Sequence, residues 1–227
     1  MSIYAIADLH LSFGAKKPMD IFAGWGDYTG RLEENWRALV APADTVVVPG
    51  DISWGMTLGE AQPDFDFIER LPGRKILLKG NHDYWWATRK KLEEWKTANG
   101  YQTIDFLFND AYVVENTGIC GTRSWFYDEQ DSDKVFRREL GRLRMSLDAL
   151  ADMPCEQRVA FLHYPPVYRG FQCPEILALL RDYGVRRCYY GHIHGDSIAW
   201  AWNGSSGGID FRLVSADNLG FRPLLIQ

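Results

Sequence analysis

The segment KILLKGNHDYWW, residues 75–86, constrains the fold more than any other stretch of the chain. Its apolar letters ILL predict a short buried strand. The strand ends at Gly80, where a residue without a side chain lets the backbone turn sharply, and Asn81, His82 and Asp83 follow. Ligands of open α/β sheets bind at the carboxyl ends of strands, so we interpret residues 80–83 as an active-site loop. The alternative is a turn in which Asn and Asp bond their own backbone.

The order of the apolar segments predicts an α/β fold. Strand-like runs at 3–7, 45–48 and 76–78 alternate with helical periodicity at 31–40 and about 64–71, which predicts parallel strand-helix-strand units. The last third of the chain adds consecutive strands, which indicates a second, mixed sheet. Further helices are expected at 88–96 with Thr88 as N-cap, at 131–150 with a solvated arginine face, and at 175–183, and a hairpin loop is expected at 203–208.

Composition fits one domain over residues 1–227, with 46% hydrophobic and 14% aromatic residues available for a core. A net charge of −5 argues against a dedicated nucleic-acid binder. No apolar run approaches a membrane span, and the N-terminus lacks the basic region of a signal peptide. The four cysteines are widely spaced, as expected for reduced, mostly buried thiols in a cytoplasmic protein.

All five histidines lie where a strand-like run ends or just beyond it, together with carboxylate and amide residues. A single histidine is more often a satisfied core or surface residue than a ligand, but histidines kept for packing would also occur on helices. We therefore expect one shared site. Its candidate residues are Asp8, His10, Asp51, Asn81, His82, His163, His192 and His194.

The spacing and chemistry of these residues indicate metal ions. Asp8 and His10 are two residues apart, as are His192 and His194, so each pair can point to one side of an extended segment. Oxygen and imidazole ligands without cysteine suit Zn, Mn or Fe. The set exceeds the three protein ligands of a catalytic tetrahedral site. It fits two ions that share a bridging carboxylate, the arrangement used for in-line phosphoryl displacement.

The ordered blocks resemble the calcineurin-like metallophosphoesterase family, whose pattern is D-x-H, G-D, G-N-H-[DE], a single His and G-H-x-H. In this chain they are Asp8-Leu9-His10, Gly50-Asp51, Gly80-Asn81-His82-Asp83, His163 and Gly191-His192-Ile193-His194. The resemblance implies a four-layer α/β/β/α sandwich of two mixed sheets flanked by helices, with the site at strand ends between the sheets.

The resemblance also implies a role for each residue. Asp8, His10 and His194 would hold the first metal, Asn81, His163 and His192 the second, and Asp51 would bridge them. His82 would bind no metal and would instead stabilise or protonate the leaving oxygen. In the phosphoprotein phosphatase branch a second Asp follows the G-D block and an arginine belongs to it. Here Ile52, Ser53 and Trp54 follow, which argues against that branch.

The expected activity is hydrolysis of a phosphomonoester or phosphodiester by a hydroxide that bridges two metal ions. The alternatives are a metal-bearing binding or scaffold protein on the same fold, a nuclease or nucleotide hydrolase, and a mononuclear zinc hydrolase of another fold. The substrate is expected to be small and phosphorylated, with a nucleotide-like molecule as one candidate, and neither a long nucleic acid nor a membrane is an expected partner.

Residues near the site loops could select the substrate. Aromatic rings there could stack on a base or could simply pack the loops. They are Trp54, Tyr84, Trp85, Trp86, Trp125, Phe126, Tyr127, Tyr164 and Tyr168. Arg123 and Arg169 could hold a second phosphate or a carboxylate, or could be surface arginines.

Overall fold

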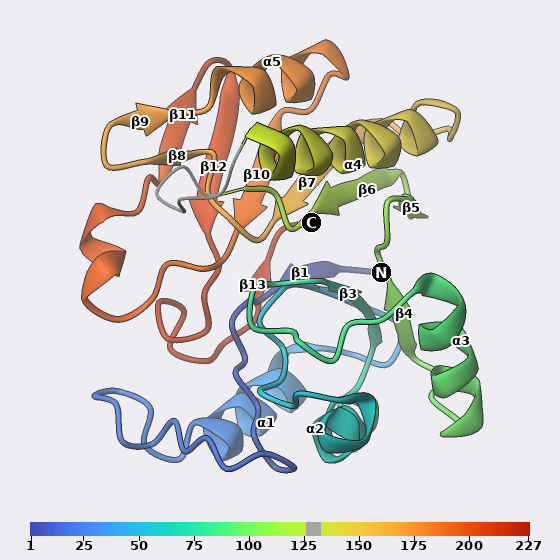
Figure 1. Cartoon of the computed structure of the whole chain (residues 1–227), viewed down its shortest axis with the longest axis vertical. Coiled ribbons are helices and arrows are strands. Elements are labelled where there is room, and N and C mark those ends of the chain that lie inside the picture. Colours follow the sequence, from blue (N-terminus) through green and yellow to red (C-terminus); the bar gives the residue numbers. More distant parts are fainter. Residues whose placement is uncertain (126–132) are drawn as a thin grey trace.

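Two sheets stacked face to face form the centre of the computed structural model, which describes residues 1–125 and 133–227 (Figure 1). The first sheet has the order β13-β1-β2-β3-β4. Its strands are β1 (Ile3–Ala5), β2 (Thr45–Pro49), β3 (Arg74–Leu78), β4 (Ile104–Phe106) and β13 (Leu224–Leu225). Strands β1 to β4 are parallel and β13 is antiparallel to β1.

The second sheet has the order β11-β12-β10-β7-β6-β5. Its strands are β5 (Tyr112–Val114), β6 (Thr117–Thr122), β7 (Gln157–Leu162), β10 (Arg187–Tyr190), β11 (Gly204–Ser206) and β12 (Ile209–Leu213). The four central strands are parallel, and the two edge strands β5 and β11 are antiparallel to their neighbours. A separate hairpin pairs β8 (Val167–Tyr168) with β9 (Phe171–Gln172). Both main sheets are therefore mixed, as the sequence indicated.

Helices cover the outer face of each sheet (Figure 1). The first sheet carries α1 (Tyr28–Leu39), α2 (Leu58–Arg70) and α3 (Arg89–Ala98), and the second carries α4 (Asp133–Ala151) and α5 (Pro174–Asp182). One apolar cluster lies between the sheets and one lies under each helical layer. The predicted four-layer α/β/β/α sandwich is confirmed.

Strand β1 shows how the sequence builds two layers at once. Ile3 and Ala5 belong to the cluster between the sheets, whereas Tyr4 and Ile6 belong to the cluster under α1 and α2. Successive side chains of a strand point to opposite faces, and both faces of this sheet are covered. A continuous apolar run is therefore the pattern that such a strand requires.

Helix ends differ from the sequence prediction where capping, and not apolar periodicity, sets the boundary. Helix α2 begins at Leu58 instead of near residue 64, because the Thr57 hydroxyl accepts the Glu60 backbone N–H at 3.2 Å. Thr88 caps α3 as predicted. The segment expected as a hairpin loop at 203–208 contains strand β11, and only Gly207 and Gly208, with φ of 59° and 80°, form the turn. The predicted start of the helix at 131–150 lies outside the described residues.

None of the helices in the described part of the chain is long and apolar enough to cross a lipid bilayer. All four cysteines are free thiols; Cys155 is half-buried and the other three are buried.

Candidate metal centre

The sandwich brings the ends of five strands to one place. Asp8 follows β1, Asp51 follows β2, Asn81 follows β3, His163 follows β7, and His192 follows β10. Parallel strands within each sheet put these carboxyl ends on the same edge, and the stacking of the sheets brings the two edges together. Both carboxylate oxygens of Asp8 accept the backbone N–H of His192 at 3.0 Å, which ties the two sheets directly at this edge.

The side chain of Asn81 contacts two imidazoles from the opposite sheet. Its Oδ1 lies 2.6 Å from His163 Nε2 and 3.0 Å from His192 Nδ1. These are the three residues that the family resemblance assigns to one metal. His163 is held from its other side, since its Nδ1 lies 3.1 Å from the Pro49 carbonyl oxygen.

Asp51 lies between the two groups of ligands. Its Oδ1 is 3.6 Å from His163 Nε2, and its Oδ2 is 3.7 Å from His10 Nε2. Asp8, Asp51 and His163 each offer a ligand atom within 4.8 Å of the others, and all three are buried, so they form a candidate metal site. The Asp51 carboxylate therefore faces an imidazole of each group.

The remaining histidines surround His10. The His194 ring lies 5.3 Å from the His10 ring between centroids, and the His82 ring lies 5.8 Å away. The Trp54 ring stacks on His10 at 5.0 Å and lies 4.4 Å from His82. All the sequence-predicted site residues are therefore gathered at one edge of the sandwich, although His194 is linked to the others through ring contacts alone among the described interactions.

Two buried polar atoms at the centre have no hydrogen-bond partner among the described residues: His10 Nε2 and Asp51 Oδ2. A buried polar group without a partner costs free energy, and a buried unpaired carboxylate costs more. These two atoms face one another at 3.7 Å, too far for a hydrogen bond. A cation held between them would satisfy both, so the residues fit a metal ion.

The electrostatics of the site also favour a bound cation. Burial raises the pKa of Asp8 to about 8 and, with the charges of Asp83 and Asp8, raises the pKa of Asp51 well above its usual range. Burial lowers the pKa values of His10 and His163 well below the ordinary histidine value. Deprotonated imidazole and carboxylate groups are the forms that bind metals, and a nearby cation favours the ionised carboxylates that burial alone disfavours.

The backbone is in the left-handed region at four of the candidate ligands. Asp8, His10, Asp51 and His192 have φ values of 56°, 45°, 52° and 70°. Left-handed backbone at such residues costs on the order of 1–3 kcal/mol each and persists where the surrounding structure enforces it. Backbone hydrogen bonds provide that enforcement here, because the N–H groups of Asp8 and His10 donate to the carbonyls of Gly50 and Asp51 at 3.0 Å.

Gly80 serves a different purpose from the one the sequence suggested. Its φ is not in the left-handed region, so the turn itself does not require glycine. A Cβ atom at this position would lie 2.1 Å from Asp51 Oδ1 and 2.2 Å from the Asp51 backbone nitrogen. Glycine is needed because two ligand loops approach closely at this point.

Asp83 is a residue whose role the sequence left open. Its buried carboxylate accepts the backbone N–H groups of Gly80 at 2.7 Å and of Asp51 and Ile52 at 2.9 Å, and the Trp85 indole N–H at 3.1 Å. It thus joins the loop after β2 to the loop after β3 and fixes two metal-ligand segments relative to one another. The turn alternative therefore applies to Asp83, whereas Asn81 directs its side chain to the histidines.

Replacing Asp83 by asparagine is expected to destabilise the protein and weaken metal binding together. An amide group offers fewer acceptor sites to these converging donors, and a buried donor left without a partner costs about 1–3 kcal/mol. Loss of an outer partner of the ligand loops is expected to lower metal affinity about 10–100-fold. Urea unfolding with chelator and a metal titration measure the two effects.

Asp66→Asn is the matched control for that substitution, since Asp66 lies on α2 and accepts the Tyr101 hydroxyl at 2.8 Å away from the centre. It should lose stability without losing metal affinity. Unchanged metal affinity in Asp83→Asn would show that the carboxylate supports folding only.

The aromatic residues near the loops divide between packing and the site. Trp85 is buried and meets Phe65 with ring centroids 4.9 Å apart, so it packs the core. Tyr164 is buried with its ring 4.5 Å from that of His192. Tyr84 is 53% exposed, and its hydroxyl lies 3.5 Å from His82 Nδ1. Phe126 and Tyr127 lie outside the described residues.

The arginines near the site loops make specific contacts with carboxylate and aromatic side chains, so they are not simply solvated surface residues. Arg123 binds the buried carboxylate of Glu139 at 3.2 Å, and so does Arg142 on α4 at 2.7 Å. The arginine face predicted for this helix is therefore only partly solvated. Arg169 lies over the rings of Tyr168 and Trp200 at 5.5 and 5.2 Å, and none of its described contacts reaches the ligand cluster.

Buried carboxylates, an amide and imidazoles converge at strand ends between two sheets and form a candidate metal site of the kind that metal-dependent hydrolases use. The chain belongs to the calcineurin-like phosphoesterase family, whose sequence model matches residues 1–196. This match covers every block of the ligand pattern, and membership of this family implies a hydrolase.

Similar proteins agree with the fold. The solved structure of the Aquifex aeolicus protein of unknown function AQ665 is similar to this chain with a TM-score of 0.54 and 16% identity, over 99% of this chain and 95% of that one. The solved structure of the Mycobacterium tuberculosis phosphopantetheinyl hydrolase PptH is similar with a TM-score of 0.55 and 16% identity, over 94% of this chain and 88% of that one. At this identity they show the fold alone. The Gene 66 protein of Mycobacterium phage L5 is 39% identical over 80 residues, which span 34% of this chain and 37% of that protein.

Proposed function

We propose that this protein is a phosphoesterase that uses two metal ions to hydrolyse a small phosphomonoester or phosphodiester. The observation that carries the proposal is the position of Asp51, whose two oxygens face imidazoles of both ligand groups at 3.6 and 3.7 Å. Membership of the phosphoesterase family supports the reaction type. A cytoplasmic location stays a prediction from the sequence.

Each ligand group supplies a cation site of mixed oxygen and nitrogen donors. Asp8, His10 and His194 would hold one ion, and Asn81, His163 and His192 the other, with Asp51 shared. This donor set suits Mn, Fe or Zn. When bound, such ions would lower the pKa of a coordinated water to about 7 and neutralise charge on the phosphoryl oxygens.

The protein itself positions the substrate and handles the proton. His82 is half-buried at the rim of the centre, with Trp54 against one side of its ring and the Tyr84 hydroxyl 3.5 Å from Nδ1. Its backbone N–H donates to Asp51 Oδ1 at 2.8 Å, which fixes the loop next to the shared ligand. From this place His82 would donate a proton or a hydrogen bond to the leaving oxygen.

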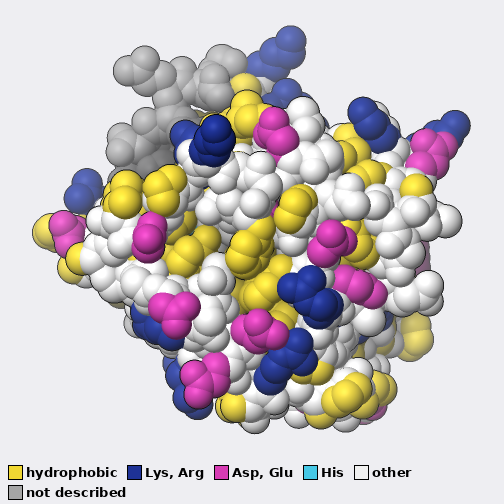
Figure 2. Space-filling model, turned by 90° about the horizontal axis from the view of Figure 1, so that it is seen from below, with side chains coloured by type: hydrophobic (Ala, Val, Ile, Leu, Met, Phe, Trp, Pro, Cys, Tyr) yellow, Lys and Arg dark blue, Asp and Glu magenta, His cyan; other side chains and the backbone are white. Residues whose placement is uncertain are grey.

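Small substrates are favoured over long nucleic acids. Figure 2 shows the face at the bottom of Figure 1, where α1 and α2 lie; acidic and basic side chains of the described residues are interspersed on it, and no histidine is visible on this face. A net charge of −5 agrees with that pattern. A long polyanion requires many Lys and Arg contacts to its phosphates.

Hydrolysis of p-nitrophenyl phosphate and of bis-p-nitrophenyl phosphate tests the proposal. After chelation, the protein should be inactive, and Mn²⁺, Fe²⁺ or Zn²⁺ should restore turnover with about two ions bound per chain. The ratio of the two rates distinguishes a monoesterase from a diesterase. A protein that binds two ions and turns over neither compound nor a panel of nucleotides would favour the metal-bearing binding protein instead.

A further inference from the structure

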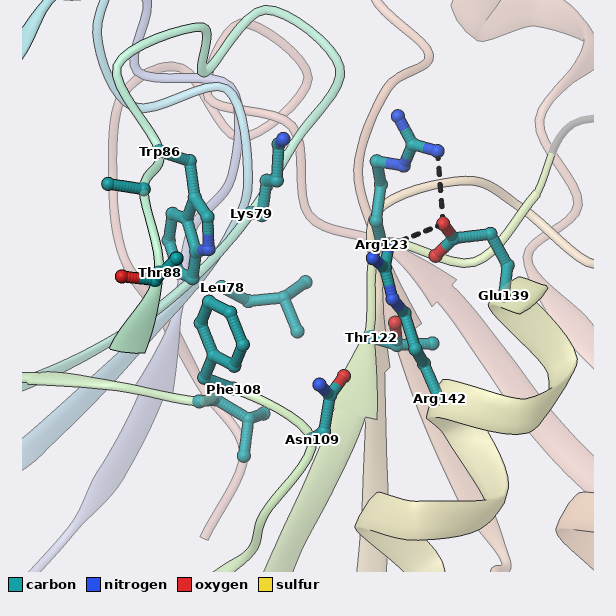
Figure 3. Close-up of a pocket in the computed structure, with 12 residues that line it drawn as sticks. Leu78, Lys79, Trp86, Thr88, Phe108, Asn109, Thr122, Arg123, Glu139 and Arg142 are labelled. Carbon is teal, nitrogen blue, oxygen red and sulfur yellow. Dashed lines mark hydrogen bonds and ion pairs between the residues drawn. The ribbon is translucent and has the colours of Figure 1, made fainter. Parts of the chain in front are cut away.

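A cavity of about 450 Å³ lies between the ends of strands of the two sheets (Figure 3). One wall comes from the end of β3 and the segments around α3 and β4, and carries Leu78, Trp86 and Phe108. The opposite wall comes from the end of β6 and from α4, and carries Thr122 and other polar side chains. One wall is thus mainly apolar and the other polar.

Cations from three separate segments line this cavity. Lys79 follows β3, Arg123 follows β6, and Arg142 lies on α4. In Figure 3 the side chains of Lys79 and Arg123 point toward the same end of the cavity from opposite walls. Positive charge is therefore present on both walls of the cavity.

The only carboxylate that lines the cavity among the described residues does not neutralise them. Glu139 is buried, and its Oε1 receives Arg142 Nη1 at 2.7 Å and Arg123 Nη2 at 3.2 Å. Lys79 forms no hydrogen bond or ion pair with the residues that the structure describes, and Arg123 Nε is buried without a partner there. The cavity therefore retains an excess of positive charge, which an anion would balance.

The apolar wall is built to receive a carbon skeleton. The rings of Trp86 and Phe108 stack with centroids 5.7 Å apart and an interplanar angle of 14°. Together with Leu78 they form an apolar surface opposite the arginines. A ligand with an anionic end and an apolar middle is complementary to such a cavity.

Both walls of the cavity lie close in the chain or in space to residues of the candidate metal centre. Lys79 is two residues before Asn81 on the same loop. The Arg123 guanidinium lies 5.8 Å from the centre of the Tyr164 ring, and that ring lies 4.5 Å from the His192 ring. These contacts place the Arg123 side of the cavity one aromatic ring away from His192.

We propose that this cavity binds a second anionic group of the substrate, a phosphate or a carboxylate, and thereby selects phosphoesters that carry two anionic ends joined by a carbon skeleton. This inference rests on the proposed phosphoesterase function for the identity of the first end. Lys79 supplies the cation that no protein carboxylate pairs, Arg123 and Arg142 supply hydrogen-bond donors, and Trp86 and Phe108 contact the linker.

The test compares ligands that differ only in their second end. Calorimetry on the Mn²⁺-loaded protein would measure the affinities of alkylphosphonates, of α,ω-alkylene bisphosphonates and of ω-phosphonocarboxylates over a series of chain lengths. At the length that spans both sites, a second anionic end should tighten binding at least about tenfold over the alkylphosphonate, as one or more charge-assisted hydrogen bonds predict. A larger gain for the ω-phosphonocarboxylate indicates a carboxylate, a larger gain for the bisphosphonate indicates a phosphate, and equal gains indicate a site that accepts either anion.

Lys79→Gln should remove most of this advantage, because it deletes the unpaired charge and breaks no described ion pair. Arg138→Gln is the matched control: Arg138 Nε also lies near Glu139, at 3.6 Å, but the residue does not line the cavity, so the advantage should persist. The inference is overturned if no chain length shows an advantage, or if Lys79→Gln retains it. Calorimetry needs no turnover, so an advantage in a protein that hydrolyses no phosphoester would reject the proposed function and leave the anion site standing.

Discussion

Asp51→Asn is expected to lose both metal ions and all metal-dependent turnover in one step. The substitution removes the charge that both ligand groups share while keeping the size of the side chain. The amide oxygen would stay with the His82 backbone N–H, which Asp51 Oδ1 accepts at 2.8 Å. The amide nitrogen would then face His10 Nε2, where a metal ligand must be an acceptor.

The expected loss of metal affinity exceeds the roughly 10–100-fold seen when only an outer partner of a ligand is removed. Metal content after gel filtration and turnover of p-nitrophenyl phosphate measure the two effects. Asp210→Asn, at an exposed position on β12, is the control and should retain both properties. A variant that keeps both ions would contradict the shared-ligand role.

Thermal unfolding of metal-free Asp51→Asn shows whether the variant loses metal because a ligand is missing or because the fold is destabilised. Burial and the charges of Asp83 and Asp8 raise the pKa of Asp51, so without a cation its ionised form is disfavoured in the fold. When folding raises the pKa of an acidic group, its contribution to the free energy of unfolding decreases as the pH rises above the pKa that the group has in the unfolded chain. The metal-free variant should therefore unfold at a temperature no lower than the metal-free parent at neutral pH.

His82→Ala is expected to have the complementary phenotype. Turnover should fall about 10²–10⁴-fold, the usual contribution of a general acid, while metal content stays near two per chain. The reason is structural, because His82 contributes its backbone N–H to the Asp51 carboxylate, and alanine keeps that donor. Parallel measurements of metal content and kcat show whether His82 acts on the leaving oxygen or binds a metal ion.

Tyr84→Phe serves as the comparison for His82→Ala. It removes a hydroxyl that lies 3.5 Å from His82 Nδ1, a distance at the limit of a hydrogen bond, so it should change turnover by less than about tenfold. Loss of metal from His82→Ala would assign the imidazole to the ligand set instead. Full activity in that variant would remove His82 from the reaction.

Much of the site could be predicted from the sequence because its candidate ligands directly follow apolar runs in the chain. The apolar letters before Asp8, Asp51 and His163 predict strands, and the residues that follow are of metal-binding types. Strand ends in a parallel sheet share an edge, so their convergence follows from periodicity and topology. The four-layer arrangement came from the family resemblance, since alternation along one strand does not say what covers each face.

Tertiary structure alone decided what depends on distances between segments far apart in the chain. Asp83 became the link between two loops because the Asp51 and Ile52 N–H groups fold against it, and Gly80 is required because Asp51 approaches it closely. The cationic cavity arises only when β3, β6 and α4 place Lys79 and Arg123 on facing walls. Side-chain periodicity reports the faces of one element, whereas these features are set by how separate elements pack. The sequence by itself determined the ligand types and their order, and the packing of the two sheets determined the geometry in which they meet.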